Sequence, residues 1–157
     1  GYQSPEIFEG VTFTVNSISQ TTGSFDSYGL NYSKGSLKVA IASDSNAKGY
    51  DNKRFASTFS LDSLDIDVGV LYQTTKKLST GISENGHVVS VKKNVFEKGS
   101  IYYQTSSSDI KLESGEQNSF GYTHKISKVS KVFVHASNLE SDTKNVDYVS
   151  VGFEYKF

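Results

Sequence analysis

Histidine is the residue type most suited to acid–base chemistry or metal binding near neutral pH, and the chain contains only three, His87, His124 and His135. Neither His124 nor His135 has a neighbouring serine or acidic residue at a spacing typical of a catalytic triad. The chain also lacks cysteine, which excludes a thiol nucleophile. We therefore expect no enzymatic activity and no catalytic residues.

The loop at 44–51, Asp-Ser-Asn-Ala-Lys-Gly-Tyr-Asp, has side chains that could bind a cation. Its acidic and amide residues are spaced in a manner similar to a calcium-binding loop. However, Lys48 occupies a ligand position, and no glutamate follows at the twelfth position of the loop. Without cysteine, a Cys-type zinc site is excluded as well. We expect a solvated loop, no metal and no cofactor.

The overall composition excludes several classes of protein. Lysine and arginine number 16 and aspartate and glutamate 17, so the net charge of -1 lacks the basic footprint of a nucleic-acid-binding protein. Only 36% of the residues are hydrophobic, against roughly 45–50% in an average soluble domain. Aromatic residues nevertheless reach 13%, which does not fit a disordered chain. No stretch approaches the run of about 20 apolar residues that a spanning helix needs.

The elements that must carry any functional side chain are β-strands, because the hydrophobic pattern has a period of two. In the last segment, Val149, Val151 and Phe153 share one face, whereas Glu154 has the opposite parity. The same alternation predicts eleven strands, at 2–7, 10–19, 26–34, 36–44, 54–62, 64–73, 87–95, 100–108, 119–127, 130–138 and 146–157.

The predicted links between these strands alternate in length. Short links fall near 8–9, 35, 63, 96–99 and 128–129, and longer polar links fall at 20–25, 45–53, 74–86, 109–118 and 139–145. Strands of about 9–11 residues with short turns on one side and long loops on the other are typical of a transmembrane β-barrel. Ser, Thr, Gly, Asn and charged residues occupy the second face of most strands, which predicts an apolar face toward lipid and a polar face toward water. A soluble sandwich or jelly roll is the alternative fold.

The polar face then supplies the candidate pore-lining residues. They are Lys38, Asp67, Lys92, Gln104, Lys125, His135 and Glu154. Arg54 is expected near a strand end or off the polar parity, outside this group. Lys92 and Lys125 lie in neighbouring hairpins and are expected to form a basic stripe that mildly favours anions. Each position could also be an ordinary solvated wall residue.

The end of the chain, Tyr148-Val149-Ser150-Val151-Gly152-Phe153-Glu154-Tyr155-Lys156-Phe157, resembles the C-terminal strand of Gram-negative outer-membrane general porins. The segments 120–127 and 132–139 are similar to the preceding hairpin of that family, and Tyr2-Gln3-Ser4-Pro5 is similar to a stretch that follows its constriction loop. Gln3 stands where many porins carry a basic residue of the pore wall. This departure leaves an arginine ladder at the constriction in doubt.

The resemblance implies an antiparallel transmembrane β-barrel in the Gram-negative outer membrane, which passes small polar solutes and ions by passive diffusion. It implies a homotrimer, contacts with outer-membrane lipid and lipopolysaccharide, and a C-terminal signal read by the barrel-assembly machinery. The residues of that signal are Phe153, Tyr155 and Phe157. The short turns are expected on the periplasmic side.

Length is the main departure from the family. Porins of this type have sixteen strands, and eleven strands account for the whole of this sequence. We therefore expect the chain to be a C-terminal fragment or split part, with the remaining strands supplied by the same or another chain. The alternatives are a complete barrel with a twelfth strand at 77–82, acting as a surface adhesin or receptor, and a client of the assembly machinery. A protease or lipase built on a membrane β-barrel is a further alternative, which rests only on analogy of fold.

Overall fold

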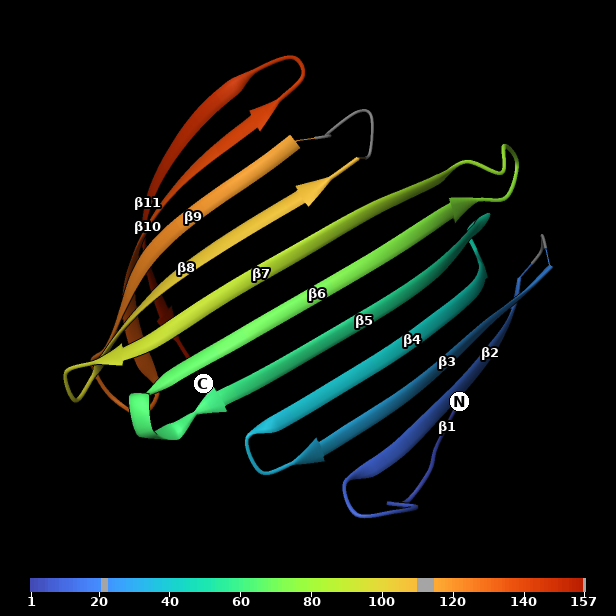
Figure 1. Cartoon of the computed structure of the whole chain (residues 1–157), viewed down its shortest axis with the longest axis horizontal. Helices are drawn as coiled ribbons and strands as arrows, with labels where there is room; N and C mark the ends of the chain where they lie inside the picture. The colour runs from blue at the N-terminus through green and yellow to red at the C-terminus, as the bar shows by residue number, and fades with distance from the viewer. Residues whose placement is uncertain (21–22, 110–114, 157) are drawn as a thin grey trace. The chain divides into compact units, whose positions relative to one another are not determined.

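The computed structural model describes residues 1–20, 23–109 and 115–156. One 3-10 turn, Asp62–Leu64, lies between two of its strands, and no helix in these described ranges is long and apolar enough to cross a membrane. The strands, coloured in chain order in Figure 1, are β1 (Tyr2–Gln3), β2 (Val11–Gln20), β3 (Gly23–Lys34), β4 (Leu37–Ala47), β5 (Tyr50–Leu61), β6 (Ile66–Lys77), β7 (Ser83–Val95), β8 (Gly99–Ser108), β9 (Gly115–Lys125), β10 (Ser130–Ser141) and β11 (Asn145–Tyr155).

The strands follow one another in the sheet as they do in the sequence, from β1 to β11 without a crossover. Short links make this the natural arrangement, because antiparallel neighbours can be joined by a tight turn. The pairings between neighbouring strands from β1 to β5, and from β8 to β11, are antiparallel. The predicted all-β class, the antiparallel arrangement and the number of eleven strands are therefore confirmed. At the two ends of the order, β1 and β11 each keep one edge without a strand partner within the described part of the chain.

Several strands extend into segments that the sequence predicts as long links. Only residues 48–49 separate β4 from β5, and only residues 78–82 separate β6 from β7. The long links expected at 45–53 and 74–86 are thus wrong. A ladder of backbone hydrogen bonds needs no apolar side chains, so pairing continues past the alternating segment. The expected opening strand is also too long, because β1 covers two residues.

The candidate twelfth strand at 77–82 is absent. Lys77 is the last residue of β6, and its backbone N–H donates to the carbonyl oxygen of Ile82 at 2.9 Å. The Gly81 N–H donates to the Lys77 carbonyl at 2.8 Å. These bonds close a turn that leads directly into β7, so the segment serves as a connection.

The chain divides into two compact units. The first unit comprises Gly1–Phe59 and Val70–His87, and the second unit comprises Ser60–Gly69 and Val88–Phe157. In the first unit, the strand register joins apolar residues in rows, with Leu30 opposite Phe13 on one side and opposite Ile41 on the other. The alternate positions form the polar face of the first unit, which includes Thr12, Thr14, Asn16, Ser27, Asn31, Lys38, Asp44, Asn52, Arg54 and Thr58.

The second unit has the same division into two faces. Val134 lies opposite Tyr122 and Val151, in a row of apolar residues that crosses β9, β10 and β11. The alternate positions form the polar face of the second unit, which includes Ser100, Gln104, Ser119, Lys125, Lys131, His135, Ser137, Ser150 and Glu154.

Two aromatic side chains on this polar face lie over glycines of a neighbouring strand. Tyr102 pairs with Gly121, and Phe133 pairs with Gly152. A Cβ atom at either glycine would overlap the aromatic ring. Glycine therefore lets each ring approach the backbone closely, a known use of glycine within strands.

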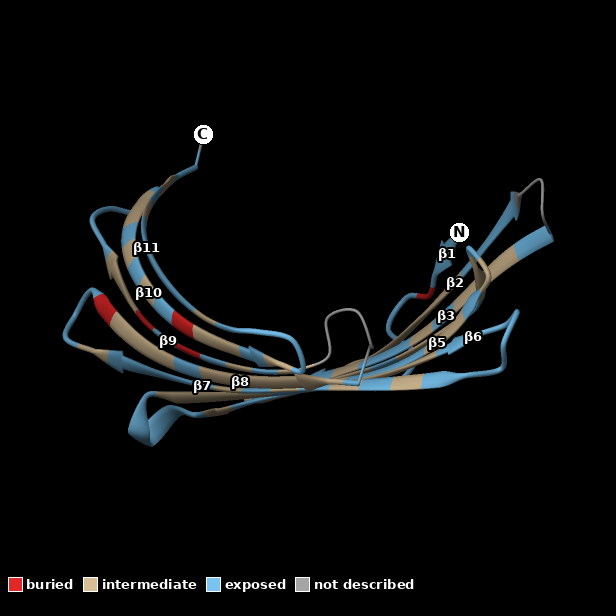
Figure 2. Ribbon diagram, turned by 90° about the horizontal axis from the view of Figure 1, so that it is seen from above, coloured by how far each residue is buried: buried red, intermediate tan, exposed pale blue. Residues whose placement is uncertain are grey.

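The described residues form no apolar core. None of their hydrophobic side chains is buried, and Figure 2 shows the buried class only as short isolated stretches. On the apolar face of β11, Val149, Val151 and Phe153 are 77%, 80% and 62% exposed. The buried polar residues are small serines, among them Ser119 and Ser137. This distribution reverses the usual preference for apolar side chains inside a soluble domain.

Candidate functional site

The polar face of each unit carries the candidate functional residues, and in the first unit it is organised around Arg54. Its guanidinium lies 3.5 Å from the Asp44 carboxylate, and its Nε donates to Gln73 Oε1 at 2.9 Å. Ser27 Oγ donates to the second oxygen of Asp44 at 2.8 Å. The Asp44 side chain is only 13% exposed, whereas that of Arg54 is 47% exposed. The carboxylate is thus held against the wall, and the cation is half in contact with solvent.

The network continues through neutral side chains. Gln73 Nε2 donates to Thr75 Oγ1 at 2.9 Å, and Thr75 Oγ1 donates to Asn52 Oδ1 at 2.8 Å. Asn52 lies directly opposite Asp44 in the pairing of β4 with β5. The chain of contacts therefore runs from Asp44 through Arg54, Gln73 and Thr75 to the register partner of Asp44, and it holds the arginine against the wall.

Arg54 was expected near a strand end or off the polar parity, and that expectation is wrong. β5 begins at Tyr50, four residues earlier than the alternation predicts, so Arg54 lies within the strand opposite Ala42. Polar residues at the start of β5 concealed the strand from a search for alternating apolar residues. Lys38 shares the polar face, opposite Thr58 and Ser33.

In the second unit, Asp67 and Lys92 form an ion pair. Lys92 Nζ lies 3.2 Å from Asp67 Oδ2, and Ser60 Oγ donates to Asp67 Oδ1 at 2.7 Å. Both charged side chains are nearly half exposed, 47% for Lys92 and 45% for Asp67. Lys92 therefore has its charge compensated locally, which distinguishes it from Lys125.

Two predicted residues of this unit, Gln104 and His135, share the polar face near β8, β9 and β10. Gln104 pairs with Ser119, and His135 Nδ1 lies 2.6 Å from the hydroxyl of Tyr102. Ser119 Oγ lies 2.7 Å from Ser137 Oγ, and Gln117 Nε2 donates to Ser137 Oγ at 2.8 Å. Because the two serines are buried, these bonds satisfy polar atoms that the neighbouring side chains shield from water.

Lys125 and Glu154 lie at the turn end of the same face. Glu154 pairs with Lys131, whose Nζ lies 2.8 Å from its carboxylate. Lys125 lies opposite Lys131 in the register. No ion pair involves Lys125 within the described ranges.

The residues of the expected C-terminal signal lie on the other face or outside the described chain. Phe153 pairs with Val132 and Tyr155 with Ser130, on the apolar side of the sheet. Phe157 lies outside the described residues. Phe153 is 62% exposed, so its ring is available to another surface.

The structure brings no catalytic or metal-binding set together from the remaining candidates. His124 Nδ1 lies 3.0 Å from the Tyr122 hydroxyl, away from the polar face. Asp44 belongs to the arginine network, and Asp51 accepts a bond from the Asn46 backbone N–H at 2.9 Å. Across the described ranges, no group of three or more His, Cys, Asp or Glu side chains is placed to hold a metal ion.

Comparison with known proteins identifies the fold. The structure is similar to an anion-selective porin from Comamonas acidovorans, with a TM-score of 0.78 and 19% sequence identity, over 99% of this chain and 58% of that chain. The chain has a porin-like fold. It spans 58% of the length of that porin. No protein-family model matches the sequence, and no curated protein matches it.

Proposed function

We propose that this chain forms part of the wall of a water-filled channel, through which small polar solutes and ions diffuse passively across a Gram-negative outer membrane. One observation carries the proposal: the sheet has an exposed apolar face and a hydrogen-bonded polar face, both across β2, β3 and β4 and across β9, β10 and β11. Soluble monomers rarely leave so extensive an apolar surface in water. Lipid on one face and water on the other accommodate both sides of the sheet.

The two ends of the strand order support further strands in the complete channel. Hydrocarbon cannot satisfy the free backbone groups at the outer edges of β1 and β11, so a membrane-spanning sheet must close. The porin to which the chain is similar is longer than this chain, which is consistent with such strands. We assign the closing strands to the same or another chain, and we propose a homotrimer in contact with lipopolysaccharide.

The exposed aromatic side chains of β11 support a role in biogenesis. We propose that Phe153, Tyr155 and Phe157 form a C-terminal signal for the barrel-assembly machinery, as the resemblance to porins implies. Replacement of Phe153 by Ala should reduce insertion into the outer membrane without changing the folded channel. A matched Val132→Ala change at the opposite position of β10 removes apolar surface but leaves the signal intact, and equal insertion defects in both variants would count against the signal.

Conductance tests the channel itself. Purified protein in a planar lipid bilayer should give stable conductance steps that grow in proportion to salt concentration, because a wide aqueous pore carries ions in their hydrated form. Folded protein that inserts into the bilayer without conducting would overturn the proposal.

We further propose a mild preference for anions, to which Lys125 contributes more than Lys92. Lys125 has no ion pair within the described residues, whereas Asp67 compensates Lys92. The similar porin is named as anion-selective, which is consistent with this direction. Lys125→Glu should move the reversal potential toward cation selectivity. Lys92→Glu is the matched control variant. If Lys125→Glu and the unmodified protein have the same conductance and selectivity, Lys125 has no role in the anion preference.

A further inference from the structure

A hollow lined by five lysines lies at the turn end of β9, β10 and β11 in the second unit. Its volume is about 600 Å³, within the usual size range of a small-molecule site. The charged residues that line it are Lys98, Lys125, Lys128, Lys131, Lys156 and Glu154. We call this group the basic rim.

Backbone hydrogen bonds bring three separate segments of the chain together at the basic rim. The Lys125 N–H donates to the Lys98 carbonyl at 2.8 Å, and the Lys156 N–H donates to the Val129 carbonyl at 2.8 Å. The turn between β9 and β10 is itself closed, since the Ile126 N–H donates to the Ser130 carbonyl at 2.9 Å. The lysines are therefore mounted on a fixed backbone, although their side chains remain flexible.

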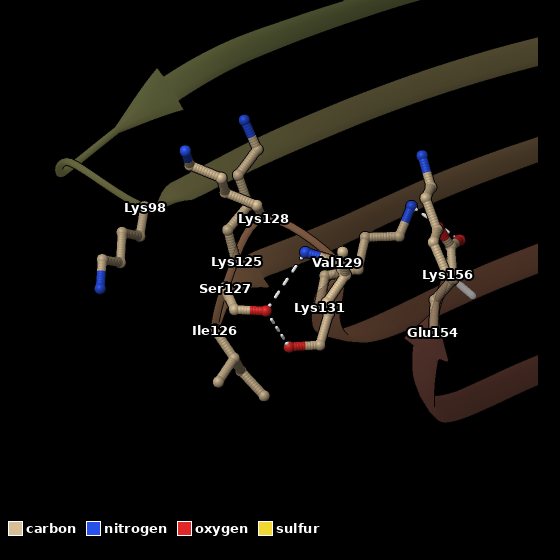
Figure 3. A pocket seen from close by; sticks show the side chains of 10 residues that line it. Lys98, Lys125, Ile126, Ser127, Lys128, Val129, Lys131, Glu154 and Lys156 are labelled. Carbon is tan, nitrogen blue, oxygen red and sulfur yellow. Dashed lines mark hydrogen bonds and ion pairs between the residues drawn. The ribbon is translucent and has the colours of Figure 1, made fainter.

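The turn that carries Lys128 also satisfies its own polar side chains. Ser127 Oγ lies 2.7 Å from Ser130 Oγ, and it accepts the Val129 N–H at 3.2 Å. These hydroxyl groups are engaged within the turn, as the dashed lines in Figure 3 indicate. A ligand in the hollow would therefore meet ammonium groups as its principal polar partners.

The positive charge of the basic rim is largely uncompensated. Glu154 pairs with Lys131 at 2.8 Å, and no other ion pair involves a rim residue within the part of the chain that the structure describes. Figure 3 shows Lys125, Lys128 and Lys156 extending to the same side of the ribbon. Five lysines against one glutamate give an excess of four positive charges, in a chain whose net charge is -1.

We propose that the basic rim is a binding site for a multivalent oxyanion, such as a phosphate-bearing solute. Lysine ammonium groups bind phosphate as point charges, and several of them around one hollow favour an anion that carries more than one charge. The same chemistry would accept a free phosphate compound or the phosphate of a lipid headgroup. The site shares Lys125 with the proposed channel wall. Its failure is distinguishable from a failure of conduction, because pyrophosphate binding is measured without a bilayer.

The test is calorimetric titration of the whole protein in neutral detergent, with pyrophosphate as the probe. Binding should be stronger for pyrophosphate than for chloride, and it should weaken as salt rises, because exposed charges are screened over a Debye length of about 10 Å at 0.1 M ionic strength. Lys128→Gln combined with Lys156→Gln should reduce the affinity for pyrophosphate by about tenfold, because the two changes remove charge-assisted hydrogen bonds to the anion.

The matched control is Lys76→Gln combined with Lys77→Gln, which removes the same charge from exposed positions at the C-terminal end of β6. Equal losses of affinity in the two double variants, or pyrophosphate binding no tighter than chloride, would overturn the proposal. Titration with anionic lipid in the same detergent identifies the source of the phosphate. A rim-dependent signal from pyrophosphate alone indicates a free solute, and a stronger rim-dependent signal from the lipid indicates a headgroup.

Discussion

Arg54 in the first unit and the basic rim in the second unit hold positive charge in opposite ways. In the first unit, Arg54 is placed between Asp44 and Gln73, and a chain of hydrogen bonds continues from Gln73 through Thr75 to Asn52. In the second unit, the basic rim holds five lysines with a single carboxylate partner. A cation on a sheet face can thus stabilise the wall or bind a solute. Which role it has depends on whether side chains of the wall already pair with it.

The largest expected effect concerns the packing of the second unit. Gly152→Val places a branched side chain where the Phe133 ring lies, and overpacking of this kind costs about 1–3 kcal/mol of the free energy of unfolding. The midpoint of urea denaturation of the detergent-folded protein measures the change. Ser150→Val, at an exposed position of the same strand and face, is the control. Similar midpoints for both variants would show that the ring does not depend on the glycine.

The next effect tests whether Arg54 serves the wall. Asp44→Asn leaves the guanidinium without its carboxylate, and we expect a loss of about 1 kcal/mol in the free energy of unfolding, because the pair is partly shielded from solvent. A double-mutant cycle with Arg54→Gln measures the coupling between the two side chains. If the two losses simply add, the arginine network does not act as a unit and the comparison between the units fails.

An effect of about the same size is expected from the bond between Tyr102 and His135. Tyr102→Phe keeps the ring over Gly121 but removes the hydroxyl group, which should cost about 0.5–1.5 kcal/mol, the usual net value of one hydrogen bond. Chemical denaturation again measures the loss. Tyr103→Phe, which removes a hydroxyl bonded to Asn118 on the other face, separates the polar-face contribution from the general effect of losing a tyrosine hydroxyl.

The smallest effect is expected at the exposed pair of Lys34 and Glu9. Their side chains are 54% and 77% exposed, and such pairs contribute about 0–1 kcal/mol. Glu9→Gln should therefore leave the denaturation midpoint nearly unchanged. A loss as large as that of Asp44→Asn would mean that partial burial does not distinguish the arginine network from an ordinary surface pair.

The strands could be predicted because alternation is a local property of the sequence. Ten of the eleven segments show their own two faces without knowledge of their neighbours, as β11 does with Val149, Val151 and Phe153 on one face. The ends of the strands could not be predicted in this way. The start of β5 is polar, and only its pairing with β4 reveals that Tyr50 and Asp51 belong to a strand.

The candidate sites depend on the register between strands, which a single sequence does not determine. Parity placed Lys125, His135 and Glu154 on one face, and the register agrees with that placement. Parity could not indicate that Asp67 lies beside Lys92, or that Lys98 and Lys156 belong to the same rim as Lys125. These residues are distant in sequence, and backbone bonds between turns bring them together.

The glycines beneath Phe133 and Tyr102 also have a mechanical consequence. If β11 slid along β10 by two residues, the Phe133 ring would meet Ser150 or Glu154 in place of Gly152, and a side chain would occupy the space that the ring needs. The corresponding movement of β9 along β8 would bring Ser119 or Thr123 beneath Tyr102. Each ring therefore blocks sliding of one strand along the other. A force along the strands should meet more resistance than the backbone hydrogen bonds alone would provide.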